Sequence, residues 1–318
     1  MYNGEKYSSA AYFQQAFCAG TAPVWGIRMK LFSDSLPFYK SNFHCHTTAS
    51  DGKLSPAAVV DFYQHAGYDI LSITDHRTVT EASSDRLLLI PGIEIDYRLP
   101  GQWVHVLGLG MDSAVSALWD RSGTPQEGID LIRRLGGLAV LAHPAWSLNT
   151  PEFMRTLTGL SGVEIWNSVS TLPLNGDRAD SASLLDVTWA SGGELLPVFA
   201  NDDSHPYQDE AGVAATMVQA EELTVGAVMN ALRDGRFYAT TGPEITQIEM
   251  RDQQEVIVRC SPAESIIFYS DCPWARGRAV INPGMTECRY LIQQNDHFIR
   301  IEVRDAAGRK AWSSPMRV

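Results

Sequence analysis

Short apolar runs alternate with helical patterns from Ser41 to Thr240, and this alternation constrains the fold more than any other feature of the chain. One helix is predicted to begin after Ser55, which can cap its first turn, with Pro56 at the first helical position. Successive strand, helix and strand units of this kind build a parallel sheet or a barrel. The sequence therefore predicts an α/β fold for this part of the chain.

The helical signals end at the turn formed by Gly242 and Pro243. The runs that follow alternate apolar and polar residues, as in ITQIEMR and HFIRIEVRD, and turn residues separate them. This pattern is typical of an all-β domain. We therefore predict three segments: an N-terminal extension over residues 1–40, an α/β domain over residues 41–242, and a small all-β sandwich domain over residues 243–318.

The charge of the chain narrows the classes of partner that it can bind. The 318 residues carry a formal net charge of -12, and no block of Lys and Arg is present to bind a phosphate backbone. Long nucleic acid is therefore disfavoured as a partner.

Five scattered cysteines without a C-x-x-C pair indicate neither a disulfide framework nor a zinc ribbon. The pattern of a secretory signal and an apolar run that could cross a bilayer are both missing, so we expect a cytoplasmic protein with no membrane contact.

Six of the eight histidines lie at or just beyond the end of a predicted strand. His44 and His46 are two residues apart on one strand, so both rings project from the same face and can converge on one ion. A set of imidazoles and carboxylates suits several first-row divalent ions better than a structural zinc. Active sites of (β/α) barrels also lie at the strand ends where these residues fall. The predicted metal ligands are His44, His46, Asp51, His76, Glu94, His105, His143, Asp203 and His205.

Each of these residues has a simpler explanation when it is taken singly. A histidine such as His105 on an apolar strand is more often a buried structural residue. Asp51 before Gly52 fits an ordinary turn. These explanations together require six histidines to end apolar strands in one domain by accident, so the metal site is favoured. The two histidines outside the pattern, His65 and His297, are assigned to structure.

The ordered series HCHTTASDG, TDH, the Glu94 strand, His105, AHP and DSH resembles the polymerase and histidinol phosphatase (PHP) superfamily of metal-dependent hydrolases. The resemblance covers about residues 41–240 and implies a distorted seven-stranded (β/α) barrel. It also implies three divalent ions of manganese, zinc or iron, with Glu94 as a bridge. By similarity, His44, His46, Glu94 and Asp203 would hold the first ion, Glu94, His105 and His143 the second, and Asp51, His76 and His205 the third.

The segment YATTGP and the β tail further resemble the carbaryl-hydrolase-like branch of this superfamily. Members that act on nucleoside bisphosphates and short RNA typically carry an inserted subdomain between the ligands that match His105 and His143. The short interval between these two residues leaves no obvious room for that insert. Cleavage of nucleotides or oligonucleotides is therefore disfavoured.

The predicted activity is hydrolysis of a small phosphate ester. A hydroxide between the first two ions would attack phosphorus, and the third ion would hold substrate oxygens. Asp203 and His205 are expected to act in catalysis as well as in metal binding. Arg77, directly after His76, is a candidate clamp for a phosphate or carboxylate group, and a surface salt bridge is its alternative role.

Two other functions remain open from the sequence. The same ions could act on the carbonyl of a carbamate or carboxylic ester. Alternatively, the protein could bind a ligand in a metal-dependent way without cutting it, with the β tail as a ligand or partner module. The segment VEIWN places Glu164 and Asn167 near the pocket, with no role assigned. The sequence does not predict an oligomeric state.

Overall fold

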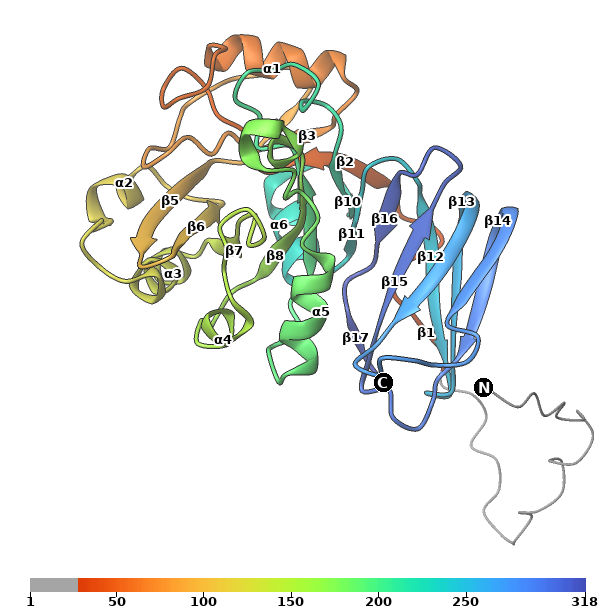
Figure 1. Ribbon diagram of the computed structural model, residues 1–318. Coiled ribbons are helices and arrows are strands. Elements are labelled where there is room, and N and C mark those ends of the chain that lie inside the picture. The colour runs from red at the N-terminus through yellow and green to blue at the C-terminus, as the bar shows by residue number, and fades with distance from the viewer. Residues whose placement is uncertain (1–27) are drawn as a thin grey trace, which may run out of the picture.

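The computed structural model describes residues 28–318, which form an α/β region and a β region side by side (Figure 1). The N-terminal extension was predicted over residues 1–40, and most of it, including Cys18, lies outside the described residues. The four described cysteines, Cys45, Cys260, Cys272 and Cys288, are all free thiols. No helix among residues 28–318 is long and apolar enough to cross a membrane.

The strands of the α/β region are short and mostly buried. They are β2 (Phe38–Asn42), β3 (Ile70–Leu71), β4 (Leu88–Leu89), β5 (Gly92–Leu99), β6 (Gln102–Leu109), β7 (Leu138–Leu141), β8 (Gly162–Asn167), β9 (Val198–Asn201), β10 (Ala215–Gln219) and β11 (Phe237–Thr240). The helices between them are α1 (Pro56–His65), α2 (Ala114–Leu118), α3 (Pro125–Arg134), α4 (Pro151–Met154), α5 (Ala182–Ala190) and α6 (Val225–Arg233).

Capping residues fix where these helices begin. The Ser55 hydroxyl accepts a hydrogen bond from the Ala58 backbone N–H, and Pro56 is the first residue of α1, as the sequence predicted. At the start of α3, Thr124 and Glu127 form a reciprocal capping box. Local sequence is therefore sufficient to set the first turn of both helices.

Strand directions differ at β6 and β10 from the parallel arrangement that the sequence suggested. β2, β3 and β4 are parallel neighbours, as are β7, β8 and β9. In contrast, β6 is antiparallel to both β5 and β7, and β10 is antiparallel to both β2 and β11. The expectation of parallel strands throughout is wrong at β6, because only the turn at Pro100 and Gly101 joins β5 to β6. Such a tight turn makes a hairpin, whereas a parallel crossover needs a dozen or more residues.

The strands of the α/β region belong to two sheets that meet at residues predicted to bind metal. β2, β3 and β4 lie in a 12-stranded sheet, and β5 to β9 form a 5-stranded sheet. Isolated parallel bridges join Cys45 to Ser204 and His76 to Glu94. The Asp203 N–H also donates to the His44 carbonyl at 2.8 Å. The backbone contacts between the two sheets therefore hold several predicted ligands in place.

The β region extends the larger sheet. Its strands are β12 (Ile245–Arg251), β13 (Glu255–Tyr269), β14 (Ala279–Leu291), β15 (Phe298–Arg304), β16 (Lys310–Trp312) and β17 (Met316–Arg317). β16 pairs with β11, so a continuous ladder connects the two regions across the predicted boundary at residues 242 and 243. β1 (Arg28–Lys30) pairs with β12. Residues 28–30 of the predicted extension thus add a strand to the β region.

A buried ion pair joins the two regions beside this ladder. Arg300 of β15 is fully buried, and its guanidinium donates to both carboxylate oxygens of Asp186 on α5 at 2.9 and 2.7 Å. Arg300 also lies over the Tyr269 ring, with 4.3 Å from its Cζ to the ring centroid. Nearby, the rings of Trp166 and Trp312 stack with centroids 5.8 Å apart. Polar and aromatic contacts therefore both fix α5 and β8 against the β region.

Replacing Asp186 with alanine tests the contribution of this ion pair. We expect the free energy of unfolding to fall by about 3 kcal/mol, because a buried guanidinium loses its main partner. Chemical denaturation followed by circular dichroism measures the change. Glu287→Ala, which removes the exposed pair between Arg259 and Glu287, is the matched control and should cost less than about 1 kcal/mol. Equal losses in the two variants would contradict this account of the ion pair.

Candidate metal centre

The structure brings all nine predicted ligands into one cluster. His44 and His46 follow β2, His76 follows β3, and His143 follows β7. Glu94 and His105 lie inside the antiparallel pair β5 and β6. Asp203 and His205 follow β9, and Asp51 lies on the loop before α1. The donor atoms fall into four overlapping groups: His46, Asp51, His76 and His205; His44, His143 and Asp203; His44, His46 and Glu94; and His76, Glu94 and His105.

The Glu94 carboxylate lies at the centre of this cluster. The side chain is buried, and its two oxygens face imidazole nitrogens from five histidines. The distances from these oxygens are 3.3 Å to His44 Nε2, 3.2 Å to His46 Nε2, 3.1 Å to His76 Nδ1, 2.9 Å to His105 Nδ1 and 3.3 Å to His143 Nε2. A carboxylate in this position can bridge two ions, as the resemblance implied for Glu94.

Several buried polar atoms of the cluster lack hydrogen-bond partners. His76 Nδ1, His105 Nε2 and Asp203 Oδ1 are buried without one. Asp203 Oδ1 nevertheless lies 3.0 Å from both His44 Nε2 and His46 Nε2, and these two nitrogens are 3.3 Å apart. Buried polar atoms are almost always satisfied, so lone pairs that face one another across such short distances fit a cation held between them. The donor set therefore suits divalent metal ions.

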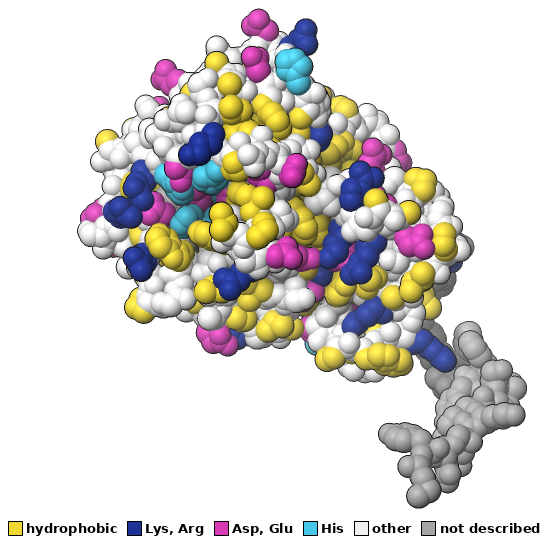
Figure 2. Space-filling model, turned by 45° about the horizontal axis from the view of Figure 1, so that its top comes forward, with side chains coloured by type: hydrophobic (Ala, Val, Ile, Leu, Met, Phe, Trp, Pro, Cys, Tyr) yellow, Lys and Arg dark blue, Asp and Glu magenta, His cyan; other side chains and the backbone are white. Residues whose placement is uncertain are grey.

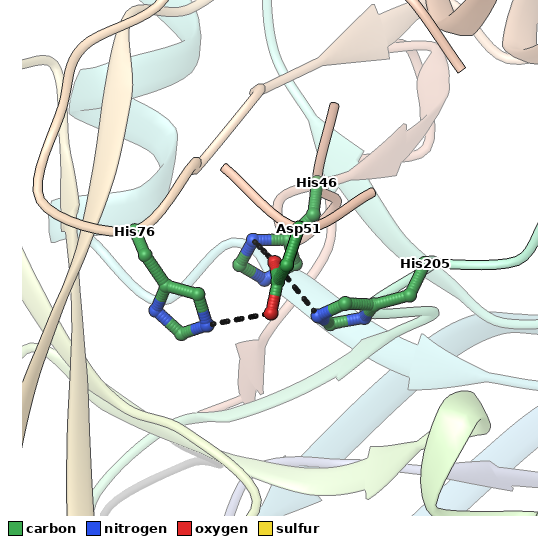
Figure 3. Close-up of side chains that lie close together, drawn as sticks. All are labelled: His46, Asp51, His76 and His205. Atoms are coloured by element: carbon green, nitrogen blue, oxygen red, sulfur yellow. Dashed lines mark ion pairs between the residues drawn. The ribbon is translucent and has the colours of Figure 1, made fainter. Parts of the chain in front are cut away.

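A second part of the cluster is open to solvent. Figure 3 shows the rings of His46, His76 and His205 around the carboxylate of Asp51. Its oxygens lie 3.7 Å from His46 Nδ1, 3.7 Å from His76 Nε2 and 3.3 Å from His205 Nε2. The Asp51 side chain is 57% exposed, whereas that of Glu94 is 1% exposed. An ion held here would be within reach of a ligand from solution.

This geometry groups three histidines differently from the arrangement that the resemblance implied. His143, which the resemblance placed with Glu94 and His105, stands with His44 and Asp203. His46 belongs to the Asp51 group as well as to the Glu94 group. His76, which the resemblance assigned only to the third ion, also stands with Glu94 and His105. The rings of His46 and His76 lie between the buried and the exposed parts of the cluster. Both histidines are therefore shared between the two parts of the cluster.

Opposite charges stabilise the cluster. Burial lowers the pKa of His46, but the nearby carboxylates of Asp203 and Glu94 outweigh burial and raise this pKa to about 9. Burial raises the pKa of Glu94, but the charges of His105, His44 and His76 outweigh it and hold the pKa well below its usual value. At neutral pH the carboxylate is therefore ionised and His46 is protonated. A metal ion would replace such protons as the partner of the carboxylates.

Glu164 orients two of the predicted ligands from behind. It is fully buried, and one oxygen accepts hydrogen bonds from His44 Nδ1 at 2.9 Å and Asn201 Nδ2 at 2.8 Å. The other oxygen accepts from the His143 N–H and from Asn167 Nδ2, both at 2.9 Å. With Nδ1 donating to Glu164, the His44 Nε2 lone pair faces the cluster. Glu164 and Asn167 thus lie behind the ligands, whereas the sequence placed them near the pocket without a role.

Asp75 supports the loop that carries Asp51. Its carboxylate accepts hydrogen bonds from the Thr47 N–H and hydroxyl, both at 2.7 Å, and from the Ser50 hydroxyl at 2.6 Å. Asp75 is not among the site residues that the sequence predicted. Asp75 directly precedes His76. Its hydrogen bonds to Thr47 and Ser50 therefore link the loop that carries Asp51 to the segment that carries His76.

Arg77 forms a two-pronged salt bridge with Asp96, at 2.6 Å from Nε and 2.9 Å from Nη2. Arg121 approaches the same carboxylate at 3.4 Å. This contact corresponds to the alternative role of Arg77, a surface salt bridge. The side chain nevertheless lines a recess of about 450 Å³ beside Asp51 and His76, so its role as a substrate clamp remains a prediction. Asp96 is not among the site residues that the sequence predicted, although its position two residues after Glu94 on β5 places both side chains on one face.

A second cavity, of about 320 Å³, opens directly over the cluster. Figure 2 shows histidine and acidic side chains in a hollow with hydrophobic side chains beside them. The hydrophobic members of its wall are Trp146, Val169, Leu172, Leu174 and Pro206. Periodicity gave no signal for this wall, because it comes from irregular segments. His65, at the end of α1, and His297, paired with Asp271, take no part in the cluster.

Known proteins that are similar to part or most of this chain include two enzymes and one protein of solved structure. No protein-family model matches it. A 5'-3' exoribonuclease from Haemophilus influenzae is 36% identical over 80 residues, covering 23% of this chain and 29% of that protein. A 3',5'-nucleoside bisphosphate phosphatase from Chromobacterium violaceum is 28% identical over 103 residues, covering 30% of this chain and 36% of that protein. A solved two-domain protein from Bacteroides vulgatus, containing a predicted PHP-like metal-dependent phosphoesterase, has a TM-score of 0.51 at 18% identity.

The two kinds of similarity differ in extent. The chain spans little more than a third of the bisphosphate phosphatase and less than a third of the exoribonuclease. The solved structure instead matches across 89% of this chain and 95% of its own. It therefore confirms the mixed α/β fold that the sequence predicted.

Replacing Glu164 with glutamine tests how the ligands are oriented. We expect Mn²⁺ binding to weaken by roughly 10- to 100-fold, because glutamine keeps one acceptor oxygen where four donors converge. Competition with a fluorescent chelator measures the affinity. The exposed Glu221 offers the matched control, since Glu221→Gln should bind Mn²⁺ as the unaltered chain does. Unchanged affinity in Glu164→Gln would show that the ligands do not depend on this residue.

Proposed function

We propose that this chain is a metal-dependent hydrolase of the PHP superfamily and that it hydrolyses a small phosphate ester at a centre of divalent ions. The observation that carries this proposal is the Glu94 carboxylate, buried among five imidazoles with unpartnered donor atoms around it. A purely structural cluster would be expected to satisfy these atoms with protein hydrogen bonds. Ligand atoms that need a cation, at the floor of a cavity, are better explained by catalysis.

Bound divalent ions would supply a water of lowered pKa as the nucleophile and would neutralise charge on the phosphoryl group. We propose three ions of manganese, zinc or iron. Glu94 would bridge the buried positions, and Asp203 would share the first with His44 and His46. The half-exposed group around Asp51, with His205, would hold the third ion. That ion would in turn bind substrate oxygens. Glu164 would keep the His44 lone pair directed at the centre.

The fold supports this proposal through the way in which its strands surround the cluster. The proposal treats β2, β3 and β5 to β9 as the seven strands of a distorted barrel. The isolated bridges at Cys45 with Ser204 and at His76 with Glu94 are where those strands would close. A barrel of this kind places its ligands at one end. A cytoplasmic location, where such ions and small esters are available, is also part of the proposal.

A small substrate fits this chain better than a nucleic acid. The relatives named above include an exoribonuclease, so RNA must be considered. The chain carries a formal net charge of -12, which disfavours a long polyanion. Between β6 and β7, the segment from Gly110 to Gly137 holds only α2 and α3, which leaves no inserted subdomain to bind one.

Hydrolysis of a carbamate or carboxylic ester remains the second candidate. The apolar wall of the cavity favours it, because such a substrate carries no charge on the scissile group. The same ions would then polarise a carbonyl. Binding without catalysis is a third possibility, but it leaves the complete ligand set without a purpose.

Initial rates of the manganese-loaded protein distinguish these three functions. We expect turnover of a chromogenic phosphomonoester or phosphodiester, and we expect Asp203→Ala to lose it by at least about 100-fold because the buried ions lose a shared ligand. A carbamate and a carboxylic ester with the same chromophore are the comparison substrates. Turnover of these alone would replace phosphate hydrolysis by the second candidate. If no substrate is turned over, the catalytic proposal fails.

Arg77 offers a separate test of substrate binding. We expect Arg77→Ala to raise KM for the phosphate ester more than it lowers kcat, because a cation at the rim of the site would bind the substrate in the ground state as well as in the transition state. Arg121→Ala is the matched control, since Arg121 shares the Asp96 partner but does not line the recess. An unchanged KM in Arg77→Ala would limit Arg77 to its salt bridge.

A further inference from the structure

We infer that the substrate carries an uncharged hydrophobic group, an alkyl or aryl residue, on the far side of the scissile bond. This inference rests on the proposed function and names the class of ester on which it acts. The hydrophobic group would lie against one wall of the 320 Å³ cavity, which we call the apolar wall. Its side chains are those of Trp146, Val169, Leu172, Leu174 and Pro206.

The apolar wall and the metal ligands share one cavity. The lining of this cavity includes His143, Asp203 and His205 as well as the apolar wall. Leu174 is 100% exposed. A single exposed leucine is ordinary, but five apolar side chains beside a polar reaction centre form the kind of surface that binds a ligand. Ligand pockets typically combine such walls with a few polar groups that fix orientation.

Hydrogen bonds hold the apolar wall in place without a ligand. Two short 3₁₀ helices, η1 (Ser168–Thr171) and η2 (Pro173–Asn175), carry Val169 and Leu174, and Leu172 lies between them. Asn175 Nδ2 donates to the Val169 carbonyl at 2.9 Å, and Asn175 Oδ1 accepts from Trp146 Nε1 at 3.3 Å. The polar group of Trp146 is therefore satisfied. Its ring remains available for apolar contact, at 4.9 Å from the His143 ring centroid.

The charges around this cavity argue against a second phosphate on the substrate. None of the described residues that line it is Lys or Arg. Arg77, in the neighbouring recess, already donates a hydrogen bond to each carboxylate oxygen of Asp96. A phosphate placed against the apolar wall would lose water without gaining a cation, which is unfavourable. A substrate with one reactive ester and an uncharged hydrophobic group avoids this cost.

Binding of phosphonates, which cannot be hydrolysed as phosphate esters are, tests the inference on the manganese-loaded chain. The probes are ethylphosphonate, hexylphosphonate and hexane-1,6-bisphosphonate, and calorimetry gives each Kd. Full burial of a methylene group strengthens binding by roughly fourfold. We therefore expect hexylphosphonate to bind at least about tenfold more tightly than ethylphosphonate, and the bisphosphonate to lose most of this gain. Equal affinities for the two monophosphonates, tighter binding of the bisphosphonate, or no binding of any probe would overturn the inference.

Substitutions show whether the gain comes from the apolar wall. In the double variant Leu172→Ser with Leu174→Ser, the ratio of the two monophosphonate affinities should fall to within about threefold of one. Val187→Ser, at an exposed valine of α5 that does not line the cavity, is the matched control and should keep the ratio. An unchanged ratio in the double variant would overturn the inference. These measurements need no turnover, so failed hydrolysis would refute the proposed function separately.

Discussion

Burial of the Glu94 carboxylate is the constraint on which the rest of the structure depends. An ionised carboxylate is strongly disfavoured away from water unless positive charge or several donors surround it. Five imidazoles surround Glu94 and fulfil this requirement. Those rings come from strands distant in sequence, so the strands must meet around one point. The same arrangement leaves lone pairs on His105 and Asp203 that hydrogen bonds within the protein do not satisfy.

The surrounding structure serves to hold these rings at fixed angles. Glu164 satisfies four donors and sets the orientation of His44 and the backbone of His143. Asp75 does the same for the loop before Asp51. On the other side, the β region adds strands to the larger sheet and is fastened to α5 through Arg300. Rigid support of this kind suits a site whose ligands must stay within a fraction of an ångström of their positions.

Much of the candidate site could be predicted from the sequence, because its residues obey local periodicity. The two-residue spacing of His44 and His46 on a strand already indicates a shared face. The cap at Ser55 and Pro56 likewise located the start of α1. Both are properties of a few neighbouring residues, which sequence patterns describe well.

The remainder depends on contacts between distant segments or on irregular backbone. The antiparallel direction of β6 follows from a turn at Pro100 and Gly101 that was not recognised within an apparent series of parallel strands. The four bonds to Glu164 come from other strands and loops, so no spacing encodes them. The apolar wall is built by 3₁₀ segments, including Leu174, which carry no strong periodicity. The pairing of β1 with β12 is equally non-local, at opposite ends of the chain.

The most direct test of this account is anomalous X-ray diffraction from crystals of the manganese-loaded chain, recorded at the manganese absorption edge. The account predicts anomalous peaks inside the cluster, with the Glu94 carboxylate between two of them and a further peak beside Asp51. Peaks only elsewhere on the molecule, or none in crystals grown with saturating Mn²⁺, would contradict the claim that these residues form a metal centre.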